Sequence, residues 1–190
     1  MKGRGFWGRG WRWLLVGALV LPFFSPQEFK GLSRANSKTN PCENFGIHRL
    51  KKEPPPFSLK SLEGKEVSLK DYKGKPVLLF FWGSWCQACK EDLALLEKFG
   101  GRSNLQMEIL TIAVDGEKER RIRSIVKEYR ITLPVLLDQK EKTARAYGVR
   151  MIPTAYLINQ EGWMEGMIVG QREWHSSEAQ LAIREALGLH

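Results

Sequence analysis

The sequence predicts an α/β domain in which a central mixed β-sheet is flanked by helices. Strand-length apolar runs alternate with segments whose apolar residues recur every three or four positions, which is typical of strands joined by amphipathic helices. The run 77–82 is apolar throughout and is typical of a strand covered on both faces. With 190 residues, the chain is long enough for one such domain and a leader.

Residues 1–30 have the plan of a signal peptide or an N-terminal membrane anchor. Basic residues precede an apolar run over 13–24, which is short for a spanning helix, and no clear small-residue cleavage site follows it. Because the positive charges stay on the cytoplasmic side, either version exports the rest of the chain. We therefore expect a location in the periplasm or on the outer face of the cytoplasmic membrane, anchored if the leader is not cleaved.

Residues 31–56 are predicted to be a linker. The stretch is polar and irregular, and it ends in three consecutive prolines, which favour an extended spacer. Cys42 lies in it and is expected to be an unpaired linker thiol. The folded domain is then expected over 57–190.

The first half of this domain contains a hairpin, the central strand and two helices. Two short strands surround Glu63-Gly64, an N-terminal hairpin, and the strand 77–82 leads into a helix that ends near Gly100-Gly101. A second apolar strand covers 107–114. Asp115 is expected to cap the helix that follows, whose apolar positions are Ile122, Ile125, Val126 and Tyr129.

The second half returns the chain to the sheet. We expect a short strand over 134–137, a helix over 141–147 that Gly148 ends, and antiparallel strands over 154–158 and 164–169. A capping box at 177–180 opens the last helix.

Two cysteines follow the central strand at the mouth of a helix. Cys86 would lie at the first turn, where free N–H groups and the helix dipole stabilise a thiolate. Cys89 comes one turn later on the same face, within reach of a disulfide with Cys86. This spacing predicts a pair that cycles between dithiol and disulfide.

Other interpretations of the cysteines and of the charge are weaker. A C-x-x-C pair is also half of a zinc site, but Cys42, His48, His175 and His190 have no ligand spacing, so we expect no metal. The formal charge of +9 includes four basic residues of the leader. Most of the other basic residues alternate with acids, as on a solvated helix face, and no nucleic-acid-binding motif accompanies them.

The segment Phe81-Trp82-Gly83-Ser84-Trp85-Cys86-Gln87-Ala88-Cys89-Lys90-Glu91 resembles the active site of the thioredoxin superfamily, and Ile152-Pro153-Thr154 lies where that family has its cis-proline. The leader, the N-terminal hairpin and the strand-helix insertion over 109–129 are similar to the TlpA-like and ResA-like extracytoplasmic thiol-disulfide oxidoreductases. The similarity extends from about Pro56 to Leu187.

This resemblance implies a thioredoxin-like fold and a role for each motif residue. Cys86 is expected to be the nucleophile and Cys89 the resolving thiol. Pro153 and Ile152 would face the pair and, together with Trp85, contact the substrate. The redox-active disulfide would need no metal or organic cofactor.

Two positions depart from familiar members of the superfamily. Phe80 stands where many cytoplasmic thioredoxins bury an aspartate, and Asp92 stands where ResA-like relatives carry a glutamate. We expect Asp92, or failing that Glu91, to tune the thiols or relay their protons. The alternative is an exposed carboxylate that merely interacts favourably with the helix dipole.

The resemblance also implies the reaction and its partners. We expect a monomeric enzyme that reduces disulfides in client proteins, with apocytochrome c among the candidate clients. A membrane electron donor of the CcdA/DsbD type is expected to re-reduce it. The alternatives are a disulfide-forming oxidase on the same fold, or a copper-binding or redox-inactive module. A peroxidase is disfavoured because a Pro-x-x-x-Thr-x-x-Cys pattern is absent.

Overall fold

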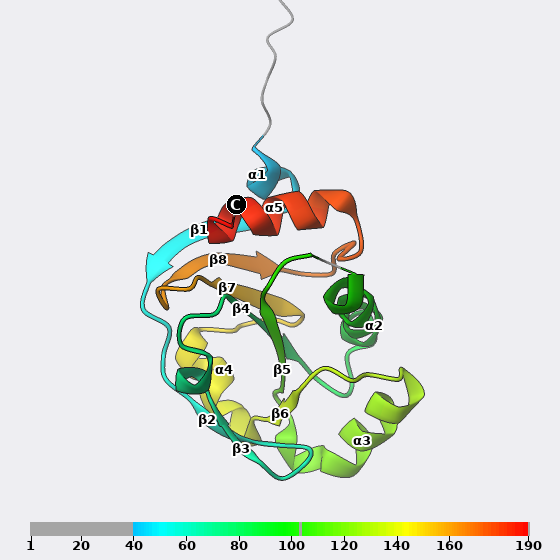
Figure 1. Cartoon of the computed structure of the whole chain (residues 1–190). Coiled ribbons are helices and arrows are strands. Elements are labelled where there is room, and N and C mark those ends of the chain that lie inside the picture. Colours follow the sequence, from blue (N-terminus) through cyan, green and yellow to red (C-terminus); the bar gives the residue numbers. More distant parts are fainter. Residues whose placement is uncertain (1–39, 103, 190) are drawn as a thin grey trace, which may run out of the picture. The chain divides into compact units, whose positions relative to one another are not determined.

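The strands form one mixed sheet, with helices on both of its faces (Figure 1). The computed structural model describes residues 40–102 and 104–189. Within them the strand order is β1-β8-β7-β4-β5-β6-β2-β3, in which β4, β5 and β6 are parallel and the other neighbours antiparallel. The strands are β1 (Ile47–Lys52), β2 (Ser58–Ser61), β3 (Glu66–Ser68), β4 (Val77–Trp82), β5 (Glu108–Ala113), β6 (Val135–Leu137), β7 (Thr154–Ile158) and β8 (Met164–Val169). The predicted fold class is confirmed.

Helices and short 3-10 turns connect these strands. The helices are α1 (Pro41–Asn44), α2 (Gln87–Arg102), α3 (Glu119–Glu128), α4 (Lys142–Tyr147) and α5 (Ser177–Leu187), and the 3-10 turns are η1 (Leu69–Tyr72), η2 (Gly116–Lys118) and η3 (Gln139–Glu141). The hairpin β2-β3 and the strand-helix pair β5-α3 lie where the sequence predicted them. Gly148 ends α4 in the left-handed conformation with a φ of 76°, which a glycine adopts without strain.

Strand β4 is the centre of the core because all six of its side chains are buried. Alternate residues point to opposite faces. Leu78, Phe80 and Trp82 pack with residues of α2, α3 and α5, whereas Leu79 and Phe81 pack with residues of α4. This strand is therefore packed between two apolar layers. The packing fixes the point where the strand ends and α2 begins.

Two predicted helix caps were wrong. Asp115 makes no side-chain cap for α3, because its carboxylate instead bonds to Ser84. The N-cap of α5 is Ser176 rather than Ser177, and its hydroxyl accepts a hydrogen bond from the N–H of Ala179 at 3.0 Å. Asp and Ser both cap helices well. The local sequence pattern alone therefore does not show which of these residues caps the helix and which makes another contact.

The predicted linker was wrong over residues 41–52, whereas residues 53–56 form neither helix nor strand. Residues 41–44 form α1, and β1 pairs antiparallel with β8 at the edge of the sheet. Phe45 and Ile47 are buried, and the thiol of Cys42 is fully buried and lies 3.5 Å from the carbonyl oxygen of Ala182 in α5. Cys42 is thus a core residue rather than a linker thiol.

The predicted leader over 1–30 and the first part of the predicted linker lie outside the described residues. Among the helices that are described, none combines the length and the apolar character needed to cross a bilayer.

The buried N-terminal segment leads to a test of the domain boundary. A chain that begins at residue 57 lacks α1 and β1 and loses the burial of Phe45 and Ile47, each worth about 1.5–3 kcal/mol. We expect its free energy of unfolding in urea to be at least about 3 kcal/mol below that of a chain that begins at residue 40. Equal stabilities would restore the linker interpretation.

Candidate active site

Cys86 and Cys89 form a disulfide at the start of α2. Their Cα atoms lie 5.3 Å apart, and the backbone N–H of Cys89 donates a hydrogen bond to Sγ of Cys86 at 3.1 Å. Cys86 is partly exposed, whereas Cys89 is fully buried. The free N–H groups and positive dipole end of this helix stabilise a thiolate on the exposed sulfur after reduction. A second thiol in solution can therefore reach Cys86 but not Cys89.

A buried serine and a buried aspartate hold the turn that carries Cys86. The backbone N–H of Ser84 donates to Oδ1 of Asp115 at 3.1 Å, and its hydroxyl donates to Oδ2 at 2.6 Å. Asp115 follows β5, which runs parallel to β4, so both strands end at the same edge of the sheet. Sequence reasoning missed this bond because the two residues are 31 positions apart.

A third segment, the loop before β7, lies beside this turn. The Ile152-Pro153 peptide bond is cis, and the Pro153 carbonyl accepts a hydrogen bond from Gly170 at 2.9 Å. A Cβ atom at Gly83 would lie 2.9 Å from Cδ1 of Ile152 and 2.9 Å from Cη2 of Trp85. The missing side chain at Gly83 therefore leaves room for both Ile152 and Trp85 next to the cysteines.

Asp92, one turn after Cys89 on α2, is fully buried. Its Oδ1 accepts a hydrogen bond from the backbone N–H of Arg172 at 3.3 Å, and its Oδ2 has no hydrogen-bond partner among the described residues. Burial raises the pKa of Asp92 to about 6, although Trp174 and Arg172 act in the opposite direction. The carboxyl group of Asp92 can therefore exchange between its charged and uncharged forms near neutral pH.

Glu91, the other predicted acid, is exposed. It accepts hydrogen bonds from Nε2 of Gln171 at 2.7 Å and Nε2 of Gln87 at 3.3 Å, and these bonds lower its pKa. A carboxylate in this state remains charged at any physiological pH. Of the two acids, only Asp92 has the burial and the pKa that suit proton exchange with a thiol.

Trp174 completes the surroundings of Asp92 and was missed by sequence reasoning. Its buried ring packs edge-on against Phe80, at 6.2 Å between centroids, and against Phe45, at 5.6 Å. The side chain of Arg172 donates from Nε to the carbonyl oxygen of Phe45 at 3.0 Å. The N-terminal segment mistaken for a linker therefore supports the loop that covers Asp92.

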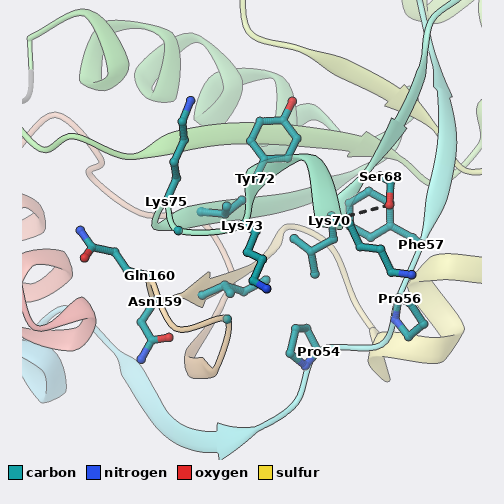
Figure 2. A pocket seen from close by; sticks show the side chains of 15 residues that line it. Pro54, Pro56, Phe57, Ser68, Lys70, Tyr72, Lys73, Lys75, Asn159 and Gln160 are labelled. Carbon is teal, nitrogen blue, oxygen red and sulfur yellow. Dashed lines mark hydrogen bonds between the residues drawn. The ribbon is translucent and has the colours of Figure 1, made fainter.

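Other features of the described part of the chain lie apart from this chemistry. Within residues 40–102 and 104–189, no three His, Cys, Asp or Glu side chains form a group that could hold a metal. A cavity of about 440 Å³ lies at the opposite end of β4, next to Val77 and Ile158, and Figure 2 shows that prolines, lysines and Tyr72 line it. It contains no cysteine, so it does not belong to the disulfide site.

The fold and the disulfide define a thioredoxin-like domain built for thiol-disulfide exchange. The model of the AhpC/TSA family matches residues 50–167, so the chain belongs to this family. Within this family the chain is a thiol-disulfide oxidoreductase of the ResA, StoA and DsbE type, as the following relatives show.

Two curated relatives are representative. The chain is 34% identical over 134 residues to the thiol-disulfide oxidoreductase ResA of Bacillus anthracis, which covers 70% of this chain and 77% of the relative. It is 36% identical over 122 residues to the thioredoxin-like protein YneN of Bacillus subtilis, with 62% and 70% covered.

Two solved structures have the same fold. StoA from Bacillus subtilis matches with a TM-score of 0.56 and 29% identity, over 68% of this chain and 95% of StoA. A Chlorobium tepidum protein assigned as thiol:disulfide interchange protein DsbE matches with a TM-score of 0.66 and 26% identity, over 75% of this chain and all of that one.

The buried carboxyl group predicts an unusual pH dependence of stability. Because the pKa of Asp92 is about 6 in the folded chain and 3.8 when exposed, the folded state takes up this proton first as the pH falls. The contribution of this proton uptake to the stability of the folded state is therefore complete below about pH 4 and is lost as the pH rises through 6. Oxidised Asp92→Asn should therefore be more stable than wild type at pH 8, by up to about 3 kcal/mol, and the difference should shrink toward pH 4.

Urea unfolding at a series of pH values measures this difference. Glu91→Gln is the matched control, since its carboxylate is exposed and should not give the same trend. A constant difference between wild type and Asp92→Asn from pH 8 to pH 4 would contradict the burial argument.

Proposed function

We propose that this protein reduces disulfides in client proteins outside the cytoplasm, with Cys86 as the nucleophile and Cys89 as the resolving thiol. The observation that carries the proposal is the asymmetry of the pair: the sulfur at the helix start is accessible and its partner is buried. An exposed thiolate can attack a client, whereas a buried thiol can react only with the bond that its neighbour has formed.

The reaction transfers two electrons from the dithiol to the client. The Cys86 thiolate attacks one sulfur of the client disulfide, and the other client sulfur leaves as a thiolate. Cys89 then loses its proton and attacks Sγ of Cys86, which releases the second client thiolate and forms the Cys86–Cys89 disulfide. A second round needs a dithiol donor, for which we propose a membrane protein of the CcdA/DsbD type.

We propose that Asp92 takes the proton from Cys89 during this second step. Cys89 and Asp92 are three positions apart on α2 and are therefore neighbours on one helix face. Both are buried, so water does not compete for the proton. A pKa of about 6 leaves the carboxyl mostly ionised at neutral pH, and this is the state that can accept a proton.

The client side of the proposed site is formed by Trp85 and Ile152, whereas the predicted Pro153, which follows Ile152 in the chain, is buried. Trp85 is 50% exposed and Ile152 is partly exposed, so both can contact an extended client segment that brings its disulfide to Cys86. The reducing direction and apocytochrome c as a candidate client rest on the resemblance to ResA-like proteins. The exported location rests on the basic and apolar pattern of residues 1–30.

The two cysteines should respond differently to substitution. Cys86→Ser should abolish reduction of an insulin disulfide, because the accessible nucleophile is lost. Cys89→Ser should still attack and should accumulate mixed disulfides with clients, since the resolving thiol is missing. Turbidity of reduced insulin and non-reducing gels measure the two effects. Cys42→Ala is the matched control for loss of a thiol outside the site. Full activity of Cys86→Ser would overturn the assignment.

Asp92→Asn should slow the resolving step. In a preformed mixed disulfide at Cys86, release of the client at pH 7 should be about 10- to 100-fold slower than in wild type, because a general base typically contributes at least this much. The difference should narrow at high pH, where Cys89 ionises without help. Rapid mixing followed by acid quenching measures the release, and Glu91→Gln should behave like wild type. Equal rates at pH 7 would rule out the proton transfer.

A further inference from the structure

Large apolar side chains are exposed beside the disulfide. Among the described residues, four large hydrophobic side chains are exposed, and two of them, Trp85 at 50% and Met151 at 61%, belong to the turn and the loop that flank the cysteines. Burial of such side chains is favourable because it removes apolar surface from water. Exposed apolar surface gathered at a reactive site indicates that it is covered by a partner.

A small cavity lies between these side chains and helix α4. It has a volume of about 150 Å³, and its apolar lining is Trp85, Val114, Ala144, Val149, Met151 and Ile152. This volume suits one side chain of a client segment rather than a separate small molecule, since ligand pockets usually measure about 300–1,000 Å³.

Three cationic side chains lie at this cavity. We call them the basic rim: Lys118, Arg145 and Arg150. Arg145 and Arg150 line the cavity, and Nζ of Lys118 lies 5.2 Å from the ring centroid of Trp85. Arg145 lies near Glu141, at 3.8 Å, and donates to the carbonyl oxygen of Lys140. In the part of the chain that the structure describes, neither Lys118 nor Arg150 forms an ion pair.

We propose that this surface selects client segments that place an acidic side chain and an apolar side chain close to the reacting cysteine. The apolar side chain enters the cavity beside Trp85 and Met151. The acidic one pairs with Lys118 or Arg150, whose charges are available. Among the described residues, Glu141 is the only acid that lines the cavity, and it already lies near Arg145, so the cavity lining keeps an excess of positive charge.

The inference deepens the proposed function and rests on it. The reaction is unchanged: a client disulfide is reduced to two thiols while Cys86 and Cys89 become a disulfide, and no other oxidant or reductant takes part. The basic rim acts before the chemistry, because complementary charge raises the encounter rate and orients the client cysteine toward Cys86.

The test uses matched peptides that carry one cysteine as a mixed disulfide with 2-thiopyridine. Reduced enzyme attacks the peptide sulfur and releases thiopyridone, which is followed by its absorbance; Cys89 then releases the peptide thiol. The three peptides have the same apolar residue next to the cysteine and differ only in two flanking positions, which are Glu, Gln or Lys. For each enzyme variant, the second-order rate constants of the peptides are compared as ratios, so that a change in the reactivity of the enzyme toward all peptides cancels.

Wild type should react with the Glu peptide about tenfold faster than with the Gln peptide at low ionic strength, and slowest with the Lys peptide. Added salt should reduce this ratio. In K118Q/R150Q the Glu-to-Gln ratio should fall toward one, and in K118E/R150E the Lys peptide should become the fastest. The control K65E/K98E changes two exposed lysines away from the cavity by the same net charge as K118E/R150E and should keep the wild-type ratio.

The outcomes separate this inference from the proposed function. Release of thiopyridone from all three wild-type reactions at equal rates would overturn the selection of acidic clients and leave the exchange chemistry standing. A ratio that falls equally in K65E/K98E would show that net charge acts rather than the basic rim, which also overturns the inference. No release from any peptide, or release that persists in Cys86→Ser, would overturn the proposed function itself.

Discussion

The position of the redox site depends on the double burial of β4. Apolar side chains leave this strand toward both faces of the sheet, so it cannot slide by one residue without moving each of them into the wrong layer. The strand therefore ends at a fixed point, and the turn to α2 begins there. The parallel neighbour β5 ends at the same edge, where Asp115 accepts hydrogen bonds from the backbone N–H and the hydroxyl of Ser84. Packing sets the place of Cys86, and these two hydrogen bonds set its orientation.

The acid of the site is held in a different way. Asp92 is buried at a free-energy cost, and its pKa of about 6 is a measure of that cost. The cover comes from the loop that contains Arg172 and Trp174, which in turn packs on Phe45 at the beginning of the folded domain. Phe45 thus connects the N-terminal segment to the loop that covers Asp92, and through it to the protonation of a group next to Cys89.

Sequence reasoning succeeded where the determinant is local. The apolar run of β4, the helical period of α3 and the C-x-x-C spacing are each contained in a short window. It failed on β1 because most residues of this strand are polar and exposed, as on many sheet edges. The prolines that follow the strand also suggested a spacer. Ser84 with Asp115, and Trp174 with Phe80, could not have been paired from the sequence, because those contacts join distant segments and no local pattern encodes them.

The burial of Cys42 keeps a third thiol away from the disulfide site. Its thiol is sealed under α5 and burial raises its pKa, so it is neither ionised nor accessible. It therefore cannot intercept a client held on Cys86 or form a competing bridge with Cys89. Of the three cysteines in the chain, the proposed exchange therefore involves only the bonded pair Cys86 and Cys89, so each turnover would transfer a single pair of electrons.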